Sequence, residues 1–152
     1  MEPRINFQDV PKGLFDSLIR TGFHFKQSKV DHTTLELVKN RVSQINGCAF
    51  CLDMHYKDAI HLGETPVRIY SLPAWKECPY YTEKERAAIA LSEALTNGHQ
   101  LEVSDELYAT LSAHFSKEEI AELTIAISLT NTWNRINKAF LTTPGNYQPG
   151  QF

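Results

Sequence analysis

The sequence has few cysteines, no excess of positive charge and no long apolar run, and each absence excludes a class of protein. Its 15 Lys and Arg residues against 18 Asp and Glu residues give a formal net charge of -3. That charge offers no electrostatic surface for nucleic acid or an anionic membrane. No apolar stretch approaches the ~20 residues of a membrane span, and the N-terminus lacks a signal-peptide hydrophobic region. We therefore expect a cytoplasmic protein that binds neither nucleic acid nor membrane.

Cysteine is scarce, with Cys48, Cys51 and Cys78 only. Three is too few, and an odd number, for the disulfide framework of a secreted protein. In a reducing cytosol, a Cys-x-x-Cys pair is more often catalytic or metal-binding than a structural crosslink. Cys78 lies in a segment typical of a loop. We interpret it as incidental, the alternatives being a fourth metal ligand or a second redox thiol.

Strand-like alternation is also absent, whereas helical spacing of apolar residues recurs along the chain. The 152 residues, of which 42% are hydrophobic, fit one domain spanning residues 1–152. An irregular arm is expected at residues 1–8 and an irregular tail from Thr142 onward. The predicted helices cover about residues 11–25, 33–46, 48–62, 67–72, 82–96, 104–114 and 116–140. The fold class is therefore all-α, a bundle of six or seven helices.

Capping signals define where these helices begin and end. Asp9 is a possible capping residue for the first helix, and Asp31 for the second. The stop signal Asn46-Gly47 ends the second helix, because glycine readily adopts the left-handed conformation found there. Cys48 then lies at or near the start of the next helix. Three segments match the capping-box pattern, namely Thr33-x-x-Glu36, Thr82-x-x-Glu85 and Ser116-x-x-Glu119.

The last predicted helix has an unusually broad apolar surface. Ile120, Leu123 and Ile127 lie on one row, and a second row includes Trp133 and Phe140. This surface exceeds what one face of a small bundle needs. We interpret the helix as partly central and partly a subunit interface, which predicts a homo-oligomer.

The densest chemical pattern is Cys48-x-x-Cys51-x-x-x-His55. On a helix, side chains three or four positions apart share one face. A helix N-terminus favours an anion on Cys48, and His55 can accept the proton of Cys51 and stabilise its thiolate. We therefore assign Cys51 as the attacking sulfur and Cys48 as the resolving thiol, which closes a disulfide after peroxide oxidises Cys51 to a sulfenic acid.

Two other interpretations of this pattern remain open. The cysteines could be small core residues, since free cysteine is often buried. They could also bind zinc with His55, as two thiolates and an imidazole are three of the usual four ligands. The sequence supplies no second Cys-x-x-Cys or histidine pair to complete such a site. We interpret four other histidines as surface or helix-end residues, namely His32, His61, His99 and His114.

The segment Leu35-Glu36-Leu37-Val38, the following run Arg41 to Cys51 and His55 together resemble the AhpD-like alkyl hydroperoxidases of the carboxymuconolactone decarboxylase superfamily. Residues 82–96 are similar to a second helix of that family, so the resemblance covers roughly residues 12–100. It implies an all-helical AhpD-like domain that assembles as a homo-oligomer, often a trimer or hexamer. It also implies a peroxidase that cycles through a Cys48–Cys51 disulfide.

The same resemblance places the family's catalytic glutamate on Glu36, which acts through water and His55 to deprotonate Cys51. It implies a hydroperoxide substrate, an external dithiol reductant such as a lipoyl or thioredoxin-like protein, and no bound cofactor or metal. One position departs from the family, because Phe50 stands where its best-characterised peroxidase has a histidine. The alternative function is a weakly active helical oligomer that acts as a redox sensor or binds a ligand or partner protein. Lactone decarboxylation is not expected, since that branch generally lacks the cysteine pair.

Overall fold

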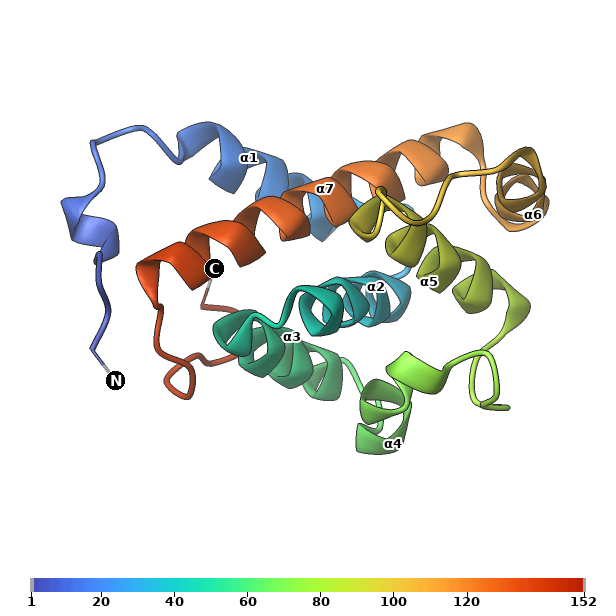
Figure 1. The fold of residues 1–152 in the computed structure, drawn as a ribbon, viewed down its shortest axis with the longest axis horizontal. Helices are drawn as coiled ribbons and strands as arrows, with labels where there is room; N and C mark the ends of the chain where they lie inside the picture. The colour runs from blue at the N-terminus through green and yellow to red at the C-terminus, as the bar shows by residue number, and fades with distance from the viewer. Residues whose placement is uncertain (1, 152) are drawn as a thin grey trace.

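The computed structural model describes residues 2–151, in which helices are joined by short connections (Figure 1). No strand occurs in this range, so the all-α prediction is confirmed. Short 3-10 turns lie at Phe7–Asp9, Phe25–Gln27 and Leu72–Ala74. The α-helices of the described residues are α1 (Asp16–His24), α2 (His32–Asn46), α3 (Ala49–His61), α4 (Pro66–Tyr70), α5 (Glu83–Thr96), α6 (Asp105–His114) and α7 (Lys117–Phe140).

Helix α2 lies at the centre of the packing, against α3, α5 and α7. In Figure 1, α7 crosses the molecule with α1 on one side and α2 and α3 on the other. The apolar row Ile120, Leu123 and Ile127 of α7 is buried in the main hydrophobic cluster, while Ile125 on its outer face is 48% exposed. The central role predicted for this helix is thus confirmed, and the subunit interface stays a prediction.

Most helix boundaries follow the local signals. The capping boxes Thr82/Glu85 and Ser116/Glu119 both form, with each hydroxyl accepting the backbone N–H of its glutamate. Gly47 ends α2 with a φ of 61°, a left-handed conformation that glycine adopts without steric cost. The next residue, Cys48, is the N-cap of α3. The sequence therefore predicted the position of this cysteine correctly.

Three local predictions were wrong. The Thr33/Glu36 capping box does not form, because the side chain of Asp31 caps α2 instead by accepting the backbone N–H of Thr34. The side chain of Glu36 is therefore not used in capping and points into the protein interior. Asp9 does not cap the first helix: it ends the short turn at Phe7–Asp9, where its side chain accepts the backbone N–H of Asn6, the N-cap of that turn. Helix α1 begins at Asp16 rather than near residue 11.

Both chain ends pack on the helices. In the N-terminal arm, Arg4 donates its backbone N–H to Phe140 O, and Phe7 packs edge-to-face with Phe140. Phe15, which directly precedes α1, packs in the same way with Trp133 of α7. The C-terminal tail contains no helix within the described residues, as predicted, yet it is fixed against α3. Within residues 2–151, no helix combines the length and apolarity needed to cross a membrane.

Candidate active site

The two cysteines of the motif are joined in a disulfide at the start of α3. Cys48 and Cys51 are linked through their sulfurs with their Cα atoms 5.3 Å apart. Both side chains are buried, each 1% exposed. The backbone N–H of Cys51 points to Cys48 Sγ at 3.4 Å, so the sulfur of Cys48 occupies the position that an N-cap oxygen usually takes. The positive end of the helix dipole therefore acts on Cys48 directly.

Glu36 and His55 form a buried pair across the α2–α3 hairpin. The ring Nδ1 of His55 lies 2.9 Å from Glu36 Oε2, and the two residues are 8% and 6% exposed. His55 follows Cys51 by four residues, one helical turn, so the pair and the disulfide share one helix. All four predicted site residues thus lie on this hairpin. No hydrogen bond joins His55 to Cys51 among the described residues, and a sulfur in a disulfide has no proton for the imidazole to accept.

Glu36 is held in its ionised form. Burial by itself would raise the pKa of this carboxyl, but the charges of Lys39 and His55 and their hydrogen bonds lower the pKa to about 2. Lys39 Nζ lies 2.7 Å from Glu36 Oε1, so each carboxylate oxygen has its own partner. A buried carboxylate is stable only when it is paired and hydrogen-bonded in this way.

Two asparagines fix the hairpin around these groups. Asn40 is 1% exposed, and its amide donates to the backbone carbonyls of Glu36 and His55 at 2.9 and 3.0 Å. It therefore connects α2 to α3 directly beside the pair. From α7, the amide of Asn137 lies 3.6 Å from Cys51 Sγ, within reach for a hydrogen bond to sulfur.

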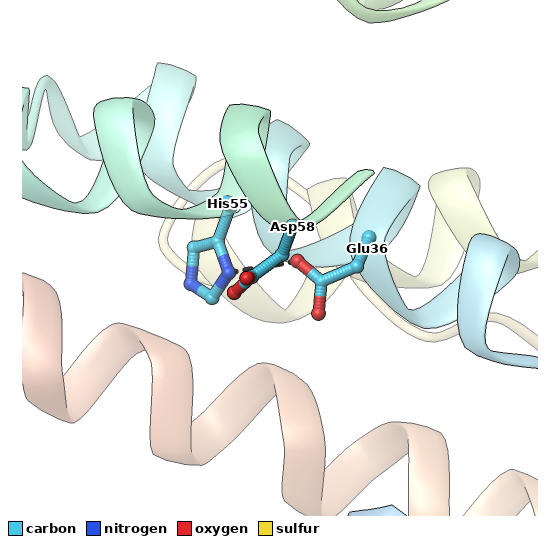
Figure 2. A group of neighbouring side chains, drawn as sticks. All are labelled: Glu36, His55 and Asp58. Carbon is cyan, nitrogen blue, oxygen red and sulfur yellow. Dashed lines mark hydrogen bonds and ion pairs between the residues drawn. The ribbon is translucent and has the colours of Figure 1, made fainter. Parts of the chain in front are cut away.

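A third titratable group completes the cluster, as Figure 2 shows: Asp58 lies next to Glu36 and His55 on the same side of the hairpin. One ligand atom from each of the three lies within 4.8 Å of the others. The hydroxyl of Tyr147, in the C-terminal tail, donates to Asp58 Oδ1 at 2.8 Å. Burial raises the pKa of Asp58, the Tyr147 hydrogen bond opposes that rise, and the nearby Glu36 charge adds to it.

By donor type, Glu36, His55 and Asp58 could hold a divalent metal ion. Each of the three residues instead has a hydrogen-bond or ion-pair partner within the protein. Lys39 and His55 hold the two oxygens of Glu36, and Tyr147 bonds Asp58. An ion bound to Glu36 would compete with the Lys39 ammonium and the imidazole for the carboxylate oxygens. The arrangement is that of an ion-pair network that can hold and move a proton.

Sequence reasoning missed Asp58, Tyr147, Asn40 and Asn137. Asp58 follows His55 by three residues on the same helix face, and that spacing could have identified it. Tyr147 offers no local signal, because only the folded tail brings it to α3. A cavity of about 410 Å³ opens beside α3 and α4, lined by Leu52, Tyr56 and Tyr70 among others. Neither cysteine is among its lining residues.

Comparison with known proteins identifies the family of the chain. The model of the carboxymuconolactone decarboxylase family matches residues 14–94. An uncharacterized protein of Bacillus subtilis, YdfG, is 44% identical over 140 residues, which cover 91% of this chain and 95% of that protein. A crystal structure of a protein of unknown function from Agrobacterium tumefaciens, proposed to be the antioxidant defence protein AhpD, is 38% identical, with a TM-score of 0.89. The match covers 96% of this chain and all of the other.

A more distant structure shares the fold alone. The debrominase Bmp8 is 20% identical to this chain with a TM-score of 0.70, over 84% of this chain and 70% of the debrominase. The same helical fold is thus found in a protein named for a debromination reaction. The matched residues 14–94 include the disulfide and the Glu36–His55 pair, and the chain is an AhpD-like member of the carboxymuconolactone decarboxylase family.

Proposed function

We propose that this protein is a thiol peroxidase that reduces organic hydroperoxides through the Cys48–Cys51 disulfide. The observation that carries the proposal is the disulfide at the N-terminus of α3, one turn before a histidine that is paired with a buried glutamate. Two sulfurs that can join without rearrangement of the helix suit a reaction that closes and reopens a disulfide. The paired imidazole supplies the base that such a thiol needs.

In the proposed cycle, the Cys51 thiolate attacks the terminal oxygen of the hydroperoxide. An S–O bond forms, the O–O bond breaks, and the departing alkoxide takes up a proton to become an alcohol. The Cys48 thiol then attacks the sulfur of the Cys51 sulfenic acid, so that the S–S bond forms and water leaves. An external dithiol, of the lipoyl or thioredoxin type, reduces the disulfide by exchange and is itself oxidised.

Glu36 and His55 act on the proton in this cycle. With Glu36 ionised on one side of the ring, the imidazole of His55 is stabilised when it takes the proton from Cys51. The same imidazolium can later return a proton to the alkoxide. Phe50 has no exchangeable proton, and so it cannot take part in this transfer.

Burial of the sulfurs favours a second candidate function, that of a redox sensor. Each cysteine is 1% exposed, so a peroxide reaches Cys51 only after the side chains around it move. A sensor tolerates slow oxidation, because its output is a change in the packing of α2, α3 and α7 or in partner binding. In that role the protein is a helical oligomer, and we expect a trimer or hexamer for either function.

Thiol counting separates the two candidates. The protein is fully reduced, freed of reductant and mixed with one equivalent of an alkyl hydroperoxide, and free thiols are counted under denaturing conditions over time. A peroxidase loses two of its three thiols within seconds, and Cys78→Ser leaves that loss unchanged. His55→Ala slows the loss strongly, because Cys51 then lacks its base. If the two thiols persist, the peroxidase proposal is wrong; slow loss indifferent to His55 supports the sensor.

A further inference from the structure

The C-terminal tail reaches the buried side-chain cluster through one residue, Tyr147. Its side chain is 5% exposed, and its hydroxyl donates to Asp58 at 2.8 Å. A tail that served only to cover the surface would not need a buried hydroxyl at this position. Asp58 in turn belongs to the cluster with Glu36 and His55 (Figure 2).

The tail is held in this place by α3 itself. Lys57 Nζ donates to the backbone carbonyls of Gly145 and Tyr147 at 2.9 and 3.1 Å. The backbone N–H of Gly145 donates to Asp53 Oδ2 at 3.0 Å, and Lys57 pairs with Asp53 at 2.9 Å. Two charged side chains on α3 therefore fix the backbone on the N-terminal side of the tyrosine and at the tyrosine itself. Tyr147 is thus placed by specific contacts and not by loose packing.

We propose that Tyr147 and Asp58 are positioning residues of the thiol site: the tyrosine hydroxyl holds the Asp58 carboxylate beside the imidazole of His55. His55 then faces two carboxylates when it takes the proton of Cys51. The inference rests on the proposed function of Cys51 as the attacking thiol, and it adds a contribution from the far end of the chain to that site.

The electrostatic effect of the pair follows from the groups that face His55. Helix α2 supplies Glu36 and Lys39, α3 supplies Asp58, and the tail supplies the Tyr147 hydroxyl, while α7 presents the neutral amide of Asn137 to Cys51. Because Lys39 offsets part of the charge of Glu36, the negative charge of Asp58 adds to that of Glu36 in stabilising the imidazolium. Loss of the Tyr147 hydrogen bond favours the neutral form of Asp58, and with it the neutral imidazole and the protonated thiol.

The test measures the ionisation of Cys51 in the reduced, full-length protein. Cys48→Ser and Cys78→Ser are introduced together so that only Cys51 reacts, and the rate of alkylation by iodoacetamide is recorded between about pH 5 and about pH 9. Tyr147→Phe keeps the ring and removes the hydroxyl. We expect it to lower the alkylation rate near pH 7 by about tenfold, the order expected for losing one hydrogen bond to a charged group. Asp58→Asn shifts the profile in the same direction.

The matched control is Tyr108→Phe, which removes a hydroxyl from an exposed residue of α6, at the opposite end of the molecule from α3 (Figure 1). It leaves the profile in place. An unchanged profile in both Tyr147→Phe and Asp58→Asn overturns the inference, even if both variants melt earlier, because tail packing alone would explain that result. If the profile shifts while hydroperoxide fails to oxidise the wild-type protein, the positioning function stands and only the peroxidase proposal fails.

Discussion

Glu36→Gln is the substitution whose effect on stability can be worked out most directly from the structure. The variant keeps the shape of the side chain and removes the charge that pairs with Lys39 and His55. The pKa of Glu36 is lowered from 4.5 to about 2 in the folded protein. Such a group stabilises the fold above its unfolded pKa, and that contribution is lost as pH falls toward the folded pKa.

The size of the effect follows from the two pKa values. A difference of about 2.5 pKa units corresponds to about 3 kcal/mol of stability at neutral pH. By about pH 3, protonation of Glu36 in the unfolded chain has removed about 2 kcal/mol of that contribution. Glu36→Gln has no such contribution to lose. We therefore expect the wild type to lose about 2 kcal/mol more than the variant between about pH 5 and about pH 3.

Urea unfolding of the oxidised protein at several pH values within this window provides the measurement, since histidine ordinarily titrates above it. Glu118→Gln is the matched control. Glu118 pairs with Lys29 at 2.7 Å, but its side chain is 62% exposed, and exposed pairs contribute about 0–1 kcal/mol. Its stability curve should follow that of the wild type.

Parallel loss of stability in the wild type and in Glu36→Gln would refute the reasoning. It would mean that the carboxyl of Glu36 has the same proton affinity in the folded and unfolded chains. The ion pairs seen in the hairpin would then contribute nothing to the fold in solution. Glu36 would also be a weaker partner for a charged His55 than the proposed cycle requires.

Two further predictions concern the hairpin and the assembly. Asn40→Leu removes two amide hydrogen bonds, one to Glu36 O within α2 and one to His55 O that connects α2 to α3. We expect it to lower the free energy of unfolding by about 2 kcal/mol, measured by urea titration, and a change below about 0.5 kcal/mol would contradict this. Sedimentation should give a mass three or six times that of the 17.3 kDa chain, and a monomer at micromolar concentration would exclude the predicted trimer or hexamer.

The parts of the fold that sequence reasoning predicted correctly depend on local interactions. Helical spacing and capping residues act within a few positions, and therefore α5 and α7 begin where Thr82 and Ser116 predicted. The placement of Cys48 at the start of α3 follows in the same way from Gly47, which ends the preceding helix. These signals can be interpreted without knowing which distant residues pack against the helix in the folded protein.

The environment of Glu36 shows where local reasoning ends. From its neighbours alone, Glu36 is either part of a capping box with Thr33 or an exposed helix residue. In the structure it is 6% exposed, because Asp31 caps the helix and His55 and Lys39 supply partners inside. Only the family resemblance indicated its importance beforehand. Tyr147 had no such indication, since its partner Asp58 lies 89 positions away in the chain.

The charge balance around His55 explains how a buried site could hold a thiolate. Transfer of a proton from Cys51 to His55 leaves the total charge of the cluster unchanged, whereas an isolated thiolate would add a buried charge at high cost. Glu36, ionised at neutral pH, stabilises the resulting imidazolium, and Lys39 limits the excess of negative charge. In the proposed cycle the proton for the departing alkoxide then comes from this imidazolium or from water, because Phe50 has none to give. His55 therefore acts in both directions, and its removal should slow both the ionisation of the thiol and the protonation of the alcohol product.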